Sequence, residues 1–191
     1  MRPVRLYKIH EIFYSIQGEG ANTGMPLVFV RFSGCNLNCP FCDTINTGGV
    51  DLNANEIYEL ADGMGKSKRV IFTGGEPLMQ LSDEILNKFI DWWIGIETNG
   101  TYEIPGGLDW VTVSPKEALH PSITKVNEIR CIIQNNIPLP SGLPSADYYY
   151  LSPLFSDMEV KQEDLQWAIN LCLENPGWRL STQNHKYWGI R

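Results

Sequence analysis

Three cysteines, Cys35, Cys39 and Cys42, fall within one short segment of the chain, SGCNLNCPFCDT. Their C-x3-C-x2-C spacing brings three soft thiolate ligands together. Closed zinc and iron–sulfur sites commonly use four protein ligands. Three thiolates therefore predict either a fourth ligand recruited from elsewhere in the chain or a [4Fe–4S] cluster with one open iron. Such an iron can bind a small molecule and pass an electron to it directly.

Zinc is the alternative metal for this segment. Zinc ribbons and fingers typically bind the ion through two separated pairs of ligands, and the sequence has no second pair of cysteines. His10, His120 and His185 lie far from the segment in sequence, so a zinc site would need folding to bring one of them in. The other two cysteines, Cys131 in EIRCIIQ and Cys172 in LQWAINLCLEN, are typical of core packing.

Composition narrows the classes of partner. A net charge of −7 and a pI near 4.9 argue against a broad surface for nucleic acid or anionic membranes. The N-terminal stretch has no apolar signal region, and no apolar run approaches membrane-spanning length. We therefore expect a cytoplasmic protein without direct nucleic-acid or membrane binding. Thiols stay reduced in the cytoplasm, where clustered cysteines more often bind metals or catalyse reactions.

The elements that position the cysteines follow from apolar runs and capping residues. Three segments predict helices: 53–64 after an N-capping Asn53, 82–93 with Ser82 as its N-cap, and 160–175 before Pro176-Gly177. Six runs predict strands, and several are continuously apolar, as in a covered parallel sheet. These runs are PLVFVRFSG, KRVIFTGG, WIGIETNG, LDWVTVSP, NEIRCIIQ and DYYYLSP. The pattern predicts one domain over 1–191, an α/β fold with an open, partial (β6/α3) TIM-like barrel.

Polar stretches follow the predicted strands directly. They are SGCNLNC, TGGEP, ETNGT, SPK and LSPLFS. Parallel α/β folds place their sites at the carboxyl ends of strands. Five such stretches at one end of a barrel would line a single pocket.

The cysteine segment resembles the signature of the radical S-adenosylmethionine (SAM) enzymes, and Phe41 matches the aromatic residue usual before their third cysteine. In that family SAM chelates the open iron through its amino and carboxylate groups. One electron then cleaves SAM to methionine and a 5′-deoxyadenosyl radical. TGGEP, at 73–77, resembles the family's GGE element, which meets the methionine amino group. Its glycines allow close backbone approach, and Glu76 suits an ammonium.

Further stretches resemble the 7-carboxy-7-deazaguanine synthase family over nearly the whole chain. They are EIFYSIQGEG (11–20) with Arg31, CDT (42–44), ETNGT, SPK and the tail QNHKYWGIR (183–191). The resemblance implies a lyase of queuosine-type 7-deazapurine biosynthesis. It would contract the ring of 6-carboxy-5,6,7,8-tetrahydropterin to 7-carboxy-7-deazaguanine with loss of ammonia, regenerating SAM. The N- and C-terminal segments would both contribute to the substrate pocket of the one radical SAM domain.

The resemblance also implies roles for individual residues. Cys35, Cys39 and Cys42 would bind the [4Fe–4S] cluster and Thr44 would bind Mg²⁺, these four forming the catalytic set. The SAM-binding set is Gly74, Gly75, Glu76, Asn99, Ser114, Pro115, Lys116, Ser152, Pro153, Leu154 and Phe155. The substrate-binding set is Ile16, Gln17, Gly18, Glu19, Arg31, Thr73, His185 and Arg191.

The substrate set has suitable chemistry. Gln17 offers a donor and an acceptor to a pterin edge, Glu19 accepts from its N–H groups, and Arg31 forms a bidentate fork for a carboxylate. The terminal carboxylate of Arg191 would also meet the pterin edge. Ordinary alternatives are a turn for QGEG, a surface arginine for Arg31 and a capped turn for Thr44. Lys116 could be a solvated charge, and His185 an ordinary exposed residue of the tail.

Partners follow from the same resemblance. We expect a small-molecule pterin substrate, a reduced flavodoxin- or ferredoxin-type electron donor and a homodimer. Two functions compete with the synthase. A small activase that installs a glycyl radical on a protein would share the cysteines and GGE but need an open docking mouth. A non-catalytic iron–sulfur or zinc module would need a fourth protein ligand.

Overall fold

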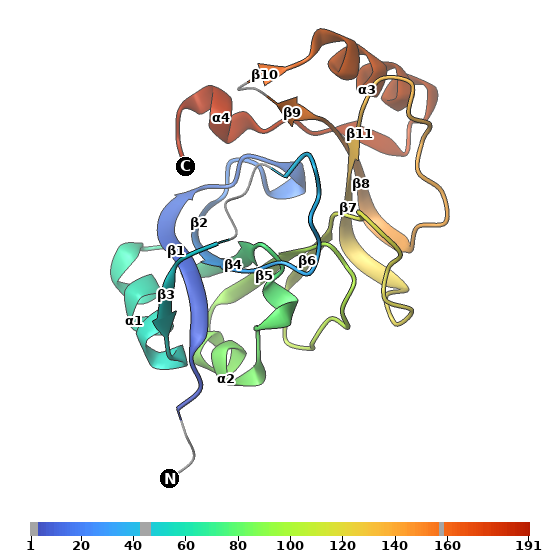
Figure 1. Ribbon diagram of the computed structural model, residues 1–191. Coiled ribbons are helices and arrows are strands. Elements are labelled where there is room, and N and C mark those ends of the chain that lie inside the picture. The colour runs from blue at the N-terminus through green and yellow to red at the C-terminus, as the bar shows by residue number, and fades with distance from the viewer. Residues whose placement is uncertain (1–3, 43–46, 157–158) are drawn as a thin grey trace.

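A nine-stranded sheet dominates the computed structural model, which describes residues 4–42, 47–156 and 159–191. The strand order is β11-β8-β7-β6-β5-β4-β2-β1-β3. Seven neighbouring strands run parallel to one another: β11, β8, β7, β6, β5, β4 and β2. β1 pairs antiparallel with β2, and β3 pairs antiparallel with β1 at the edge of the sheet. Figure 1 shows them arranged in a curve, with α1 and α2 beside one half and α3 beside the other. This arrangement confirms the predicted open, partial barrel.

All six predicted strands are present, and the sheet contains three more. β1 carries the EIFYSI motif, which sequence reasoning used only as a motif, while β3 and β11 are too short to stand out. The strands of the sheet are β1 Tyr7–Ile16, β2 Pro26–Phe32, β3 Val50–Leu52, β4 Arg69–Gly74, β5 Trp93–Thr98, β6 Trp110–Val113, β7 Lys125–Ile133, β8 Ser145–Pro153 and β11 Trp178–Leu180. A separate two-stranded sheet pairs β9 Phe155–Ser156 with β10 Glu159–Val160.

Two of the three predicted helices are confirmed. α1 spans Ala54–Met64 behind a capping box in which Asn53 and Glu56 exchange side-chain and backbone hydrogen bonds. α3 spans Gln162–Glu174, and a short α4, Asn184–Trp188, lies in the tail. None of the helices in the described ranges is both long and apolar enough to cross a membrane.

The helix predicted over 82–93 is wrong for most of its length. α2 covers only Asp83–Leu86, a single 3-10 turn follows at Asn87–Phe89, and Trp93 already begins β5. The Ser82 hydroxyl makes no capping bond and lies 2.6 Å from the Tyr7 hydroxyl instead. Burial of Phe89 and Trp92 against the sheet requires the chain to turn here, so tertiary packing overrides the local helical pattern.

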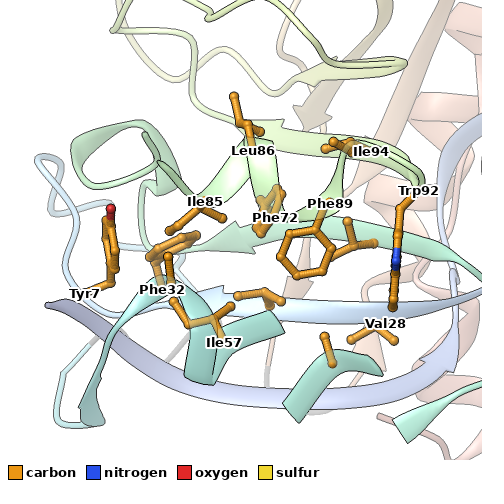
Figure 2. Packing of buried hydrophobic residues seen from close by; sticks show 14 of the residues in the cluster. Tyr7, Val28, Phe32, Ile57, Phe72, Ile85, Leu86, Phe89, Trp92 and Ile94 are labelled. Atoms are coloured by element: carbon orange, nitrogen blue, oxygen red, sulfur yellow. The ribbon is translucent and has the colours of Figure 1, made fainter. Parts of the chain in front are cut away.

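Two apolar layers cover the outer face of the sheet. The first lies under α1 and α2, where Phe32 and Phe72 from the strands pack with Ile57 and Phe89 (Figure 2). The second lies under α3 and includes the predicted core residue Cys131. These layers fix the strand register, because a slip of one residue would turn every inward side chain outward.

The inner face changes character along the strands. β2 points Val30 and Phe32 outward into the first core, so the intervening Arg31 points inward, as the alternation predicts. At the amino ends, Phe13, Leu27, Phe29 and Ile71 form an apolar base inside the curve. Towards the carboxyl ends the inward residues become polar, and the site lies there.

Candidate active site

Two adjoining cavities lie at the carboxyl ends of the parallel strands. The cluster-side cavity has a volume of about 210 Å³, and the tail-side cavity has about 450 Å³. Both are lined by Glu19, Thr73, Glu97 and Gln183. These four polar side chains form a shared wall along which the two cavities adjoin, so molecules bound in the two cavities would meet there.

The cluster-side cavity brings together most of the residues predicted for the cluster and SAM. Its predicted members are Cys35, Cys39, Cys42, Gly74, Gly75, Asn99, Ser114, Lys116, Ser152, Pro153, Leu154 and Phe155. These come from the loop after β2 and from the ends of β4, β5, β6 and β8. The structure does not bring Glu76 or Pro115 into the lining of either cavity.

The three thiols line one side of this cavity. Cys35 and Cys39 are partly exposed, Cys42 is exposed, and the Cys42 amide donates to the Cys39 carbonyl at 3.1 Å. Burial raises the pKa of the Cys39 thiol, and the nearby Lys116 ammonium opposes that rise.

A cluster suits these thiols better than a single ion. In the described part of the chain no three ligating side chains gather to hold one metal ion, and no histidine lines the cavity. The thiolates of a [4Fe–4S] cluster bind different irons around a cube, so three thiols that line one cavity suit it. The donor set thus fits the cluster, whereas the recruited histidine of the zinc alternative is not among the described lining residues.

The GGE element has a structural task beside its predicted one. The Gly75 amide donates to the Phe32 carbonyl at 3.1 Å, and the Glu76 amide donates to the Gly34 carbonyl at 2.9 Å. These bonds tie the end of β4 to the backbone that leads into Cys35. Gly75 has no room for a side chain, because an added Cβ would lie 2.6 Å from the Gly34 carbonyl carbon.

Glu76 is fully buried and already hydrogen-bonded. Its carboxylate accepts from the Thr98 hydroxyl at 2.7 Å, the Asn99 amide at 2.8 Å and the Leu78 amide at 2.9 Å. Burial raises the pKa of the carboxyl, and these three donors oppose the rise. Glu76 therefore holds the turn after β5 behind the cavity, and its predicted contact with an ammonium stays a prediction.

Asn99 and Lys116 connect the remaining loops to the cysteine loop. The Asn99 side-chain amide donates to the side-chain oxygen of Asn36, Oδ1, at 3.0 Å. The Lys116 Nζ atom lies 5.7 Å from the centre of the Phe41 ring. Burial lowers the pKa of Lys116, with Arg130 as the next cause.

The tail-side cavity is lined by all eight residues predicted for the substrate: Ile16, Gln17, Gly18, Glu19, Arg31, Thr73, His185 and Arg191. Apart from Thr73 on β4, these residues come from the first 31 and the last seven residues of the chain. The tail docks on β1 and its loop, where the Asn184 amide donates to the Gly18 carbonyl at 3.2 Å and Ser15 Oγ donates to the Arg191 carbonyl at 2.7 Å. Gly18 lies so close to His185 that an added Cβ would be 2.6 Å from its backbone nitrogen.

Charge is organised in two groups around this cavity. In the first, Glu11 pairs with both Arg31, whose Nε donates at 2.9 Å, and the side chain of Arg191. Because that pair uses Nε, the two terminal nitrogens of Arg31 can serve a ligand carboxylate. In the second, Gln17 Nε2 and Thr73 Oγ1 donate to the Glu97 carboxylate at 3.1 and 3.2 Å. The second group also includes Arg130 and Glu128.

Sequence reasoning missed Glu97, Arg130, Glu128 and Glu11. Glu97 opens the quoted ETNGT stretch, and its place at the end of a strand was a usable signal. Glu128 and Arg130 are two residues apart in NEIRCIIQ, a spacing that places both side chains on one face of a strand. Their neighbours Ile129 and Cys131 fill the outer core, so charges at the intervening positions must point into the barrel. Thr44, the predicted Mg²⁺ ligand, lies outside the described residues.

Comparisons with known proteins agree with this geometry. Residues 29–120, which include the cysteines, the GGE element and the SPK turn, match the model of the radical SAM superfamily. The chain is 38% identical over 187 residues to the 7-carboxy-7-deazaguanine synthase of Bacteroides thetaiotaomicron, covering 96% of this chain and 98% of that protein. The corresponding synthase of Haemophilus influenzae is 38% identical over 199 residues, covering 96% and 94%.

A solved structure gives the same result. The crystal structure of QueE from Escherichia coli superposes with a TM-score of 0.75 at 25% identity, covering 94% of this chain and 95% of that one. The fold and the cysteine site thus define a radical SAM protein, a class that implies a [4Fe–4S] cluster and SAM. Within it, the chain belongs to the 7-carboxy-7-deazaguanine synthase family.

Proposed function

We propose that this protein converts 6-carboxy-5,6,7,8-tetrahydropterin to 7-carboxy-7-deazaguanine with loss of ammonia. The observation that carries the proposal is the shared wall. All eight residues predicted for the pterin line one cavity, and that cavity adjoins the one lined by the three cysteines. A reaction started by a SAM-derived radical requires such adjacency, since the reacting atoms must approach within contact distance.

The described residues supply binding and orientation. When bound, the cluster and SAM supply the 5′-deoxyadenosyl radical that the resemblance implies. Arg31 forms a fork for the substrate carboxylate, and Glu11 holds that fork in place. Glu19 and Glu97 offer acceptor oxygens to N–H groups of the pterin edge. Gln17 is 5% exposed, and its side-chain amide donates to the Glu97 carboxylate. Gln17 therefore also orients Glu97.

A magnesium ion belongs to the same proposal. Thr44 follows Cys42 by two positions, and a hydroxyl is a hard oxygen ligand that Mg²⁺ accepts beside waters and substrate oxygens. Thr44→Ala is expected to weaken stimulation of turnover by Mg²⁺ while leaving the iron content unchanged. An unaltered Mg²⁺ titration for this variant would remove Thr44 as a ligand.

The partners extend the proposal. We expect a reduced flavodoxin- or ferredoxin-type protein to deliver the electron, because the reaction needs a low-potential one-electron donor. We also expect the protein to act in the cytoplasm, where thiols stay reduced. We expect it to form a homodimer. Light scattering on the reconstituted protein measures the mass, and a monomer at micromolar concentration would contradict the dimer.

The competing activase is disfavoured by the tail. α4 and the residues after it line the tail-side cavity together with the loop after β1, so a segment of the chain itself occupies the mouth that a protein substrate would need. The non-catalytic module is disfavoured by the second cavity, whose paired charges have no task in electron transfer.

Anaerobic reconstitution tests the proposed function. The protein should take up about four irons per chain, as a [4Fe–4S] cluster requires. With SAM, Mg²⁺, a reductant and the carboxytetrahydropterin, mass spectrometry should detect the deazapurine and an equal amount of ammonia. An intact cluster that binds SAM but yields no deazapurine would refute the substrate and leave the family assignment in place.

A further inference from the structure

Arg130 is a buried guanidinium surrounded by three carboxylates. It lies on the inner face of β7 and is 6% exposed. Its terminal nitrogens lie 2.7 Å from the nearer oxygen of Glu97 and 3.7 Å from that of Glu128, and its Nε lies 4.0 Å from Glu19. A buried cation with three anionic neighbours is a costly arrangement that a fold retains only where the geometry is useful.

The three carboxylates have different positions. Glu19 and Glu97 belong to the wall that both cavities share, whereas Arg130 reaches only the cluster-side cavity. Glu128 lies deeper, at 1% exposure, and accepts the Ala21 amide at 2.8 Å. That bond holds the turn after Glu19, so β7 anchors the loop that carries Glu19 and the side chain of Glu97 at the same time.

We propose that Arg130 is a positioning residue, which holds the Glu97 carboxylate by a hydrogen bond and attracts the Glu19 carboxylate in the shared wall, so that their oxygens accept from the N–H edge of the substrate. This inference rests on the proposed function. Arg130 acts through the two carboxylates. The bond to Glu97 sets the direction of that side chain, together with the donors Gln17 and Thr73 on its other side.

The charge on Glu97 is part of this role. An ionised carboxylate accepts at both oxygens, whereas a protonated one donates at one of them. Arg130 lowers the pKa of Glu97 against the effect of burial, with smaller help from Thr73 and Arg31. The other charged groups that face this centre are Glu128, which repels Glu97, Glu19, which attracts Arg130, and Lys116, which lies on the Arg130 side.

The main test replaces the guanidinium. Arg130→Gln is expected to lower kcat/KM for the carboxytetrahydropterin roughly 30-fold or more, as when one partner of a buried charge pair is truncated. The loss should fall mainly on KM. Iron content should stay close to wild type, and SAM affinity, measured without substrate, should fall by much less than kcat/KM, although Arg130 also lines the cluster-side cavity. Arg130→Lys keeps the charge without the fork and should recover only part of the loss.

The pH profile separates positioning from general damage. Without Arg130, burial raises the pKa of Glu97, so the deficit of Arg130→Gln should be largest at low pH and shrink as pH rises. Adding Glu97→Gln should abolish that extra pH dependence and cost less than the product of the two single effects. Arg179→Gln is the matched control, since Arg179 is exposed on β11, which β8 separates from β7, and contacts Tyr148.

Each outcome has a defined meaning. If Arg130→Gln destabilises the fold, the double variant Arg130→Gln/Glu128→Gln removes one excess buried charge and carries the same measurement. Wild-type kcat/KM with an unshifted pH profile would overturn the proposal, and so would a loss confined to SAM affinity. If wild-type protein binds SAM but makes no deazapurine, the proposed function fails instead.

Discussion

Replacing Gly75 by alanine would push the GGE element against the start of the cysteine loop. The added methyl carbon would lie 2.6 Å from the Gly34 carbonyl carbon and 3.1 Å from Cys35 Cβ. Ordinary carbon contacts need about 3.5–4.0 Å, so the two backbones must separate by roughly 1 Å. Overpacking of this kind costs about 1–3 kcal/mol. For a chain of this length the midpoint of thermal unfolding should then fall by roughly 2–12 °C.

The assay measures both the fold and the site. Thermal unfolding of the apoprotein gives the midpoint, and iron and sulfide analysis after anaerobic reconstitution gives the cluster content. Gly63→Ala is the matched control, because Gly63 is in α1 and its added Cβ would meet nothing within 4 Å. Alanine there should raise the free energy of unfolding by about 0.5–1 kcal/mol. We expect Gly75→Ala to lose iron as well as stability, since Cys35 is displaced.

Two results would refute this reasoning. A Gly75→Ala protein with the wild-type midpoint and full iron content would show that the backbones separate at no cost. A protein that loses stability but keeps all its iron would show that the position of Cys35 does not depend on the GGE element.

Three further predictions concern other parts of the molecule. Gly18→Ala should raise the KM for the pterin several-fold and spare SAM binding, because the methyl group displaces the backbone of His185; equal loss of both affinities would contradict it. Ile57→Ala should lower the free energy of unfolding by about 2–5 kcal/mol, measured in urea, because the residue is fully buried. Burial raises the pKa of Glu128, so its stabilising contribution is present below the unfolded pKa and is lost as pH rises through the folded pKa. Glu128→Gln should therefore gain stability relative to wild type as pH rises from the unfolded pKa through the folded pKa, and a constant difference in urea midpoint would contradict this sign.

The parallel strands and their loops were predictable because each fact needed was local. Runs such as KRVIFTGG show continuous burial followed at once by glycine and charge, which marks a strand ending in a functional loop. Cys35, Thr73, Asn99, Ser114 and the turn at 152–155 follow such runs, and all line the cluster-side cavity. Parallel pairing alone brings those ends together.

The errors arose where tertiary contacts outweigh local pattern. The segment 82–93 has acids in its first turn and helical apolar spacing, yet Ser82 bonds to Tyr7 and the helix stops after one turn. β7 carries Glu128 and Arg130 within a mostly apolar run. One face of the strand packs under α3, whereas the face with these two charges points into the barrel. Which face of the strand points into the barrel depends on how the whole sheet curves. The sequence of one strand does not contain that information.

The two groups of charges also limit the shape of the ligand. The guanidinium groups of Arg31 and Arg191 share Glu11 on β1, and the terminal nitrogens of Arg31 are suited to a carboxylate. Glu19 and Glu97 share Arg130 with Glu128, which gives a net negative group suited to N–H donors. The two groups are built on different strands, and Glu19 and Glu97 line the same cavity as Arg31 and Arg191. A carboxylated pterin carries both complements in one molecule, so it can neutralise each group when it binds. A ligand without the N–H donors would leave the negative group around the buried Arg130 and Glu128 without its complement, and uncompensated charge costs most in such a desolvated place.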